Sequence, residues 1–202
     1  MMNKGICIFG GSFDPVHRGH KKLALFIAES LGLRKILVIP TAMSPFKQSS
    51  GATEEQRLEM CRIAFSEDVF EVSDLEISRG GKSYTVDTVE AVKKLYPHEK
   101  LYLLIGSDQL LSFDRWYRFR DILSQVTLIS VSRERAVEKA QLEEFADERL
   151  RPFGECVILD FSAFEISSTL LREGLAQGRD MSEFIDSDVA AYIQEKGLYN
   201  NE

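Results

Sequence analysis

Short apolar runs alternate along the whole chain with stretches in which apolar residues recur at helical spacing. The apolar runs predict strands at 5–9, 35–40, 69–77, 100–108, 125–131 and 156–161. Helical spacing predicts a first helix that ends near 31–32, others over 53–65, 86–96, 136–150 and 188–196, and one that begins near 166. Strands that alternate with helices favour βαβ units, and therefore a parallel sheet with right-handed crossovers.

This alternation predicts an α/β fold: a Rossmann-like parallel sheet with helices on both faces and a small helical C-terminal part from about 166 to 202. A length of 202 residues suits a single domain over 1–202. The turn after the first strand lacks the G-x-G-x-x-G pattern, so the motif does not indicate a dinucleotide oxidoreductase.

Composition narrows the classes of function. A formal net charge of -7 argues against broad binding of nucleic acid. We expect no membrane partner, because no apolar run approaches the length of a membrane span. The scattered residues Cys7, Cys61 and Cys156 argue against a disulfide framework and, with a start that lacks a signal-peptide pattern, favour the cytoplasm.

The most informative stretch joins the first strand to the first helix and reads Gly-Gly-Ser-Phe-Asp-Pro-Val-His-Arg-Gly-His over 10–20. The two glycines allow a sharp turn and a close approach of a ligand to the backbone. The first turn of a helix offers unpaired N–H groups and a positive dipole end, which together bind anions such as phosphate. His17 and His20 lie three residues apart, so both rings can donate hydrogen bonds to the same phosphate group.

Two plainer interpretations apply to the same residues. Adjacent glycines after a strand are often only a tight turn. An H-x-x-H pair can also bind zinc, but such a site needs a third ligand, and the remaining histidine, His98, lies in a polar loop.

Further candidates follow later strands. The loop 41–51 carries Lys47 at the end of a strand where open α/β sheets bind ligands, although a solvated lysine is an equal alternative. Trp116, in the aromatic segment 113–117, could belong to the core or stack on a flat ring. At the helix that begins near 166, Ser168 and Thr169 can cap the first turn and donate to phosphate, with Arg172 one turn further on.

Taken together, these blocks resemble one family. The segment 10–20 is similar to the G-x-F-D-P-x-H-x-G-H motif of the nucleotidyltransferase superfamily. The blocks 44–47, 79–88, 105–110 with Trp116, 166–172 and 189–199 follow in the order found in bacterial nicotinate-nucleotide adenylyltransferases. The resemblance covers nearly the whole chain, and its Ser-Tyr-Thr and Gly-Ser-Asp…Trp blocks are the ones that point to this substrate.

The resemblance implies that ATP and nicotinate mononucleotide are joined to give deamido-NAD and pyrophosphate. It also implies that Mg²⁺ arrives together with ATP and that the protein itself has no metal site. It implies catalytic roles for His17, His20 and Arg172. It implies that ATP is bound by Gly10, Gly11, Ser12, Phe13, His17, His20, Gly106, Asp108, Ile166, Ser167, Ser168 and Arg172. For the pyridine nucleotide it implies Lys47, Ser83, Tyr84, Thr85, Asp108, Trp116 and Arg133.

Two departures and two alternatives accompany this resemblance. Ser44 and Phe46 replace the Pro and His of the family's usual Pro-Pro-His-Lys loop, and Arg133-Glu134-Arg135 stands where Arg-Pro-Gly is common. Another superfamily enzyme, such as a phosphopantetheine adenylyltransferase or a cytidylyltransferase, is the nearest alternative. A nucleotide-binding protein without turnover is the alternative from another class. The sequence leaves open whether the chain is a monomer or a homodimer.

Overall fold

The computed structural model describes residues 5–42, 51–132, 136–162 and 166–200. Within these residues six parallel strands form one sheet in the order β3-β2-β1-β4-β5-β6. The strands are β1 (Ile6–Gly11), β2 (Lys35–Pro40), β3 (Phe70–Val72), β4 (Leu101–Leu104), β5 (Thr127–Ser132) and β6 (Cys156–Asp160). The predicted parallel α/β sheet is therefore confirmed.

The strand order reverses between β1 and β4, which are neighbours in the sheet. Phe9 of β1 lies opposite Leu104 of β4, so both strands end at the same edge. In open parallel sheets, ligands bind outside the carboxyl ends of the strands at such a reversal. The topology thus brings the 10–20 motif and the Gly106–Asp108 block to the same edge of the sheet.

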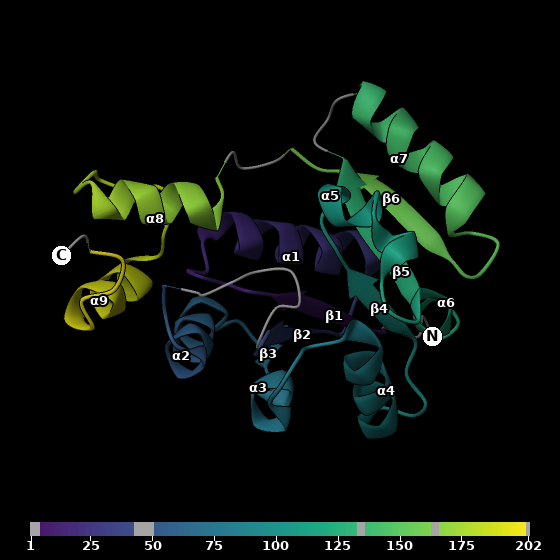
Figure 1. Cartoon of the computed structure of the whole chain (residues 1–202), viewed down its shortest axis with the longest axis horizontal. Helices are drawn as coiled ribbons and strands as arrows, with labels where there is room; N and C mark the ends of the chain where they lie inside the picture. Colours follow the sequence, from purple (N-terminus) through teal and green to yellow (C-terminus); the bar gives the residue numbers. More distant parts are fainter. Residues whose placement is uncertain (1–4, 43–50, 133–135, 163–165, 201–202) are drawn as a thin grey trace.

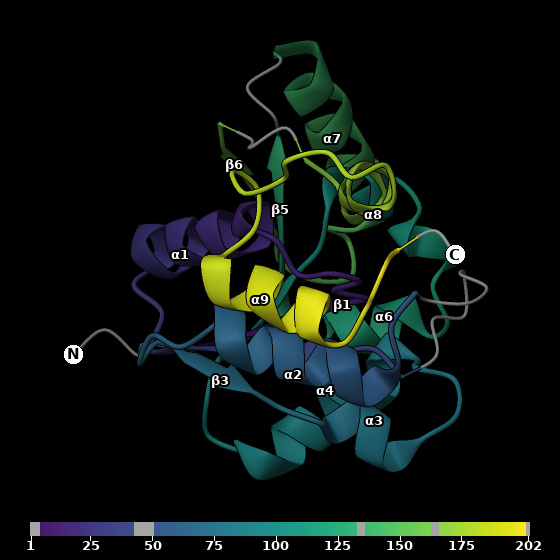
Figure 2. The ribbon, with the colours of Figure 1, turned by 90° about the vertical axis from the view of Figure 1, so that its left-hand side faces the viewer.

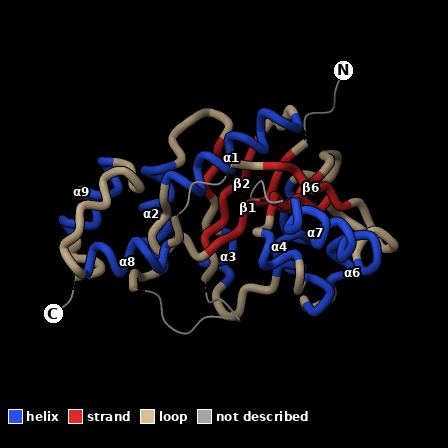
Figure 3. Tube along the Cα trace, turned by 90° about the horizontal axis from the view of Figure 1, so that it is seen from above, coloured by secondary structure: helices blue, strands red, loops and turns tan. Residues whose placement is uncertain are grey.

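Helices lie on both faces of the sheet (Figure 3), and alternating residues of β1 belong to two different core clusters. Cys7 and Phe9 belong to a core cluster with α1 (Arg18–Leu31), α2 (Glu54–Ala64), α8 (Ser168–Ala176) and α9 (Ser187–Glu195). Ile6 and Ile8 belong to a second cluster, to which the helices of the opposite layer contribute. That layer comprises α3 (Leu75–Arg79), α4 (Thr85–Leu95), α5 (Ser107–Leu110), the 3-10 helix η1 (Phe113–Arg115), α6 (Phe119–Leu123) and α7 (Ala136–Arg149).

The helices after residue 166 share the core of the sheet. Leu171 of α8 and Val189 and Ile193 of α9 are buried in the cluster that contains Cys7 and Phe9. Figures 1 and 2 show α9 running alongside α2. The predicted helical part is thus packed directly against the rest of the domain.

Two predicted strands are too long. The run 69–77 forms a strand only over Phe70–Val72, and then α3 begins at Leu75. Ser73 Oγ accepts a hydrogen bond from the Leu75 N–H, and Ser78 donates to the Asp74 carboxylate, so local polar side chains favour a helical turn. Likewise β4 ends at Leu104, and the Ser107 and Asp108 expected at its end open α5 instead.

Cys7, Cys61 and Cys156 are buried free thiols. Burial raises the pKa of Cys7 to about 12 and that of Cys156 to about 11. Among the helices of the described residues, we find none long and apolar enough to cross a bilayer.

Candidate active site

His17 and His20 cap the helix that they open. His17 is the N-cap of α1 and accepts the His20 N–H through Nδ1 at 3.3 Å. His20 Nδ1 accepts the His17 N–H in return at 3.2 Å. The two rings stack with centroids 3.6 Å apart and an angle of 19° between their planes. The two side chains thus form a capping box in which both partners are histidines.

This capping fixes the tautomer of each imidazole. A neutral ring that accepts at Nδ1 carries its proton on Nε2. Burial lowers the pKa of His17 to about 4, so this ring is neutral at pH 7. Each Nε2–H is then a neutral donor held in a fixed direction, which suits an oxygen that gains negative charge.

The same arrangement narrows one expectation. The sequence suggested that free N–H groups of the first helical turn would bind phosphate. In the structure the N–H groups of His17 and His20 are paired with the imidazoles, and the Arg18 N–H donates to the Phe184 carbonyl at 2.9 Å.

Phe13 packs against His20, and Gly11 makes room for the Phe13 ring. Phe13 is 2% exposed, and its ring packs edge-on against Phe9 and His20 at centroid distances of 5.3 and 5.1 Å. A Cβ on Gly11 would lie 2.9 Å from the Phe13 ring, so Gly11 leaves the space that this ring fills. The Phe13 side chain is thus packed in the core, and only its main chain is available to a nucleotide.

The block 166–172 lies beside the motif, as the sequence predicted. Ser168 Oγ donates to the Pro15 carbonyl at 2.9 Å, and Arg172 Nη1 donates to the Asp14 carbonyl at 2.6 Å. The N-cap of α8 is Ser167, not Ser168 or Thr169, and its hydroxyl accepts the Leu170 N–H. A Cβ on Gly19 would lie 3.2 Å from the Ile166 side chain. Because the resemblance implies that residues in 10–20 and 166–172 bind phosphate, we call these two segments the phosphate end of the site.

The acceptor end comprises residues 83–85, 106–108 and 113–117. Gly106 is the N-cap of α5, and a Cβ there would lie 2.6 Å from Asp108 Oδ1, so the exposed Asp108 carboxylate bends back over the glycine. The Tyr84 and Tyr117 rings lie 5.0 Å apart, which joins the 83–85 turn to the 113–117 segment. Trp116 is half-buried, with its ring 4.9 Å from that of Phe113.

Two buried charged residues escaped the sequence analysis. Arg57 of α2 is 2% exposed and donates to the carbonyls of Ser12 (2.7 Å), Thr41 (2.6 Å) and Ala42 (3.2 Å). It therefore ties together the chain segments that leave β1 and β2. Its position in an ordinary amphipathic helix gave no signal, because the carbonyls that it binds lie in remote segments.

Glu76 of α3 is 5% exposed and accepts a hydrogen bond from Thr88 Oγ1 at 2.6 Å. Burial raises its pKa, while the hydroxyls of Ser83 and Thr88 oppose that shift. Ser83 Oγ also accepts the Ala42 N–H at 3.2 Å, so this buried hydroxyl links the 83–85 turn to the end of β2. Glu76 escaped notice because its segment was predicted as a strand.

Some predicted residues lie outside the described residues, namely Lys47 and Arg133 with the departures at 44–46 and 133–135. Among the residues that are described, we find no group of three or more His, Cys, Asp or Glu side chains placed to hold a metal. His98, considered as a third ligand, lies exposed in the loop after α4.

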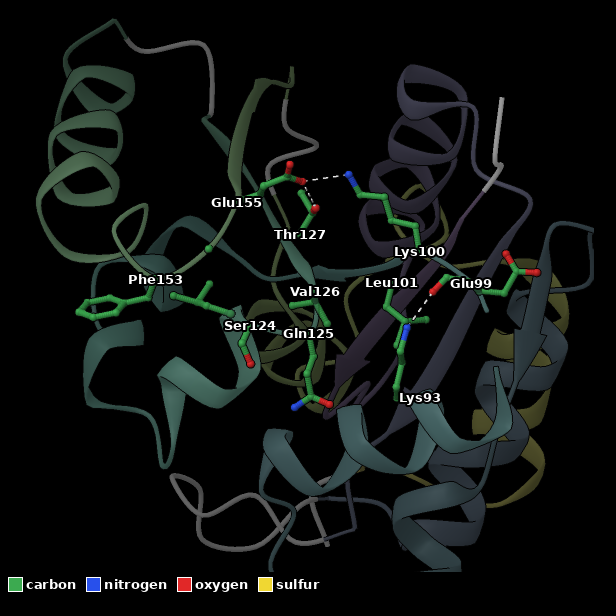
Figure 4. A pocket seen from close by; sticks show the side chains of 12 residues that line it. Lys93, Glu99, Lys100, Leu101, Ser124, Gln125, Val126, Thr127, Phe153 and Glu155 are labelled. Carbon is green, nitrogen blue, oxygen red and sulfur yellow. Dashed lines mark hydrogen bonds and ion pairs between the residues drawn. The ribbon is translucent and has the colours of Figure 1, made fainter. Parts of the chain in front are cut away.

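A hollow of about 430 Å³ lies elsewhere on the molecule (Figure 4). Its lining includes Lys100, Thr127 and Glu155, which lie at the beginnings of β4, β5 and β6. Lys100 and Thr127 both contact the Glu155 carboxylate, at 2.9 and 2.6 Å. This hollow is at the amino ends of the strands, opposite the edge where His17 and Asp108 gather.

The fold and the histidine motif define a class, the nucleotidyltransferases of the cytidylyltransferase-like type. The model of the Cytidylyltransferase-like family matches residues 8–174, which include both ends of the site.

Curated relatives identify the family within this class. The chain is 35% identical to a probable nicotinate-nucleotide adenylyltransferase of Carboxydothermus hydrogenoformans, over 98% of this chain and 100% of that protein. It is 34% identical to the nicotinate-nucleotide adenylyltransferase of Bacillus subtilis, with the same coverage of 98% and 100%. The chain therefore belongs to the nicotinate-nucleotide adenylyltransferase family.

A solved structure agrees in fold. The Plasmodium falciparum nicotinic acid mononucleotide adenylyltransferase complexed with NaAD superimposes with a TM-score of 0.78 over 97% of each chain, at 21% identity.

Proposed function

We propose that this chain transfers the adenylyl group of ATP to nicotinate mononucleotide. An oxygen of the mononucleotide phosphate attacks the α-phosphorus of ATP and forms the new P–O bond. The bond from that phosphorus to the α,β-bridging oxygen breaks, and pyrophosphate leaves with its electron pair. The products are deamido-NAD and pyrophosphate, and a phosphate dianion needs no general base to act as nucleophile.

The observation that carries the proposal is the pair of stacked histidines with both Nδ1 atoms engaged. Their Nε2–H groups can meet the phosphate oxygens of ATP from one side. Ser168 and Arg172 of α8 contact the same motif, through the carbonyls of Pro15 and Asp14. Catalysis of this kind consists of positioning two anions and stabilising the charge that develops on the α-phosphate and on pyrophosphate.

We propose that the magnesium ion enters as Mg-ATP and is part of the substrate. The groups that we assign to phosphate, the imidazoles of His17 and His20 and the guanidinium of Arg172, are donors, whereas Mg²⁺ prefers carboxylate and water oxygens. The Asp14 carboxylate at this end is buried and already accepts from Tyr199 Oη and the Gly51 N–H. The three buried free thiols support a reducing cytoplasm as the place of action.

Release of pyrophosphate tests the function. Purified protein is given Mg-ATP with nicotinate mononucleotide, nicotinamide mononucleotide, phosphopantetheine or no acceptor, and CTP replaces ATP in a parallel series. We expect turnover with ATP and nicotinate mononucleotide, at least about tenfold more efficient than with the amide, because N–H donors of the 83–85 turn can pair with a carboxylate but not with an NH₂ group.

The other outcomes discriminate among the alternatives. Turnover only with phosphopantetheine or only with CTP would assign the chain to another branch of the superfamily. ATP binding without pyrophosphate release from any acceptor would indicate a nucleotide-binding protein. Equal efficiency with the acid and the amide would remove the proposed role of the 83–85 turn.

A further inference from the structure

Asp14 of the histidine motif is hydrogen-bonded to three segments that are distant from it in the sequence. The residue is 5% exposed, and both carboxylate oxygens have donors. Tyr199 Oη donates to Oδ1 at 2.7 Å, and the Gly51 N–H donates to Oδ2 at 2.9 Å. The main-chain carbonyl of Asp14 accepts Arg172 Nη1 at 2.6 Å. Whatever orients Asp14 therefore also affects Arg172 and the chain that enters α2.

Tyr199 is held in an uncommon conformation to make this contact. It follows α9 with a φ of 61°, a left-handed value that a residue with a Cβ adopts only where its surroundings hold it. Its ring lies against Gly51, where an added Cβ would be 2.8 Å from two ring carbons. Burial and the neighbouring Asp14 raise the pKa of Tyr199, so its hydroxyl keeps the proton that it donates.

Arg172 is the group at the phosphate end that depends on this arrangement. One of its nitrogens is used by the Asp14 carbonyl and lies 3.9 Å from Asp14 Oδ2. Its side chain is about one-third exposed, so the guanidinium can also face a ligand. A rotation of the Asp14 side chain would move Oδ2, the carboxylate oxygen that faces this guanidinium, and a small displacement of a phosphate-binding cation weakens transition-state stabilisation.

We propose that Tyr199 is a positioning residue for the nucleotide phosphates: through Asp14 it fixes the direction of Arg172 and the entry into α2. This inference rests on the proposed function for its kinetic readout. It adds to the site a residue that lies 185 positions from Asp14 in the sequence and beyond the segment that the family model matches.

Tyr199→Phe tests the proposal, because it keeps the ring against Gly51 and removes only the donor to Asp14. We expect the KM for ATP to rise about tenfold, as befits a buried acceptor left unpaired, while the KM for nicotinate mononucleotide changes less than about twofold. Tyr192→Phe is the matched control, since it removes a hydroxyl from α9, and we expect both constants to stay at the wild-type values.

A double-variant cycle separates positioning from general stabilisation. If Tyr199 acts through Arg172, then Tyr199→Phe has little further effect on ATP affinity in an Arg172→Ala background. An equal effect in both backgrounds would overturn the proposal. A lower Tm with unchanged kinetic constants well below that Tm would show a purely structural role and would overturn it too.

Two further measurements keep the test decisive. Calorimetric titration with ATP reads the Tyr199 effect without any acceptor, so an error in the proposed acceptor would not hide it. If Tyr199→Phe does not fold, Gly51→Ala pushes the Tyr199 ring from its place and is expected to weaken ATP binding in the same way. ATP affinity at the wild-type level in folded Gly51→Ala would contradict the inference.

Discussion

At the phosphate end, His17, Asp14 and Arg172 are held by hydrogen bonds to the main chain or to remote residues. At the acceptor end, Asp108 is exposed, Tyr117 is 60% exposed, and the segments meet through aromatic rings. The phosphate end is thus organised by directional bonds within the protein, whereas much of the acceptor end presents side chains to solvent. Transition-state charge calls for the first arrangement, and recognition of a flat ring suits the second.

The largest effect that this contrast predicts is on His20. His20→Ala removes a directed Nε2–H donor, and loss of one such donor typically lowers turnover by about 100- to 1000-fold. It also removes the acceptor of the His17 N–H, so we expect a fall in stability of about 1 kcal/mol. Steady-state kinetics and thermal unfolding measure both, with the exposed His98→Ala as the control. Turnover within a few-fold of wild type in a folded variant would refute the assignment.

The second prediction concerns stability and pH at the phosphate end. The pKa of His17 is about 4 in the folded state instead of 6.5, so between these values only the unfolded chain takes up the proton. The stability that neutral His17 provides is therefore complete above pH 6.5 and lost as the pH falls toward 4, by up to about 3 kcal/mol. His17→Asn keeps an N-cap acceptor but does not titrate.

Urea unfolding of wild type and His17→Asn at pH 7, 5.5 and 4 measures this loss. We expect the wild type to lose more free energy of unfolding than the variant over that range. The difference cancels the carboxylates that titrate in both proteins. Parallel curves would mean that His17 is not buried as the neutral form.

How much of this contrast could be predicted from the sequence depends on how far apart in the sequence the interacting residues lie. The bounds of β2, the glycine turn and the first helix follow from local patterns, and the structure confirms them, whereas the predicted ends of β3 and β4 are wrong. The mutual capping of His17 and His20 could not be predicted from the sequence, because histidine is rare as an N-cap and the usual capping signals are Ser, Thr, Asp and Asn. The Tyr199–Asp14 contact spans 185 positions, and only tertiary structure can reveal such a pairing. The aromatic segment 113–117 left Trp116 open between the core and ring stacking, and only its order in the family blocks indicated the pyridine nucleotide.

The third prediction tests that acceptor end directly. If the half-buried Trp116 stacks on the pyridine ring, Trp116→Ala raises the KM for nicotinate mononucleotide by about tenfold or more, because a stacked ring contributes roughly 1–3 kcal/mol. The KM for ATP serves as an internal reference and is expected to change far less. Phe153→Ala removes an aromatic ring beside the hollow at the opposite edge of the sheet (Figure 4) and is the matched control. An unchanged acceptor KM in Trp116→Ala would exclude the stacking role.

The smallest effect is expected at Glu76, and its sign is opposite to that of His17. Burial raises the folded pKa of Glu76 above its ordinary 4.5, so in that window the folded state binds the extra proton. The contribution of Glu76 to stability is therefore complete below pH 4.5 and is lost as the pH rises through the folded pKa.

Glu76→Gln keeps an acceptor for the Thr88 hydroxyl and removes the titration. We expect the variant to gain stability relative to wild type between pH 4 and 7, with a modest change in the KM for nicotinate mononucleotide and none in that for ATP. If the ATP constant moved instead, the Glu76–Ser83 contacts would belong to the phosphate end, and the division of the site into two ends would fail.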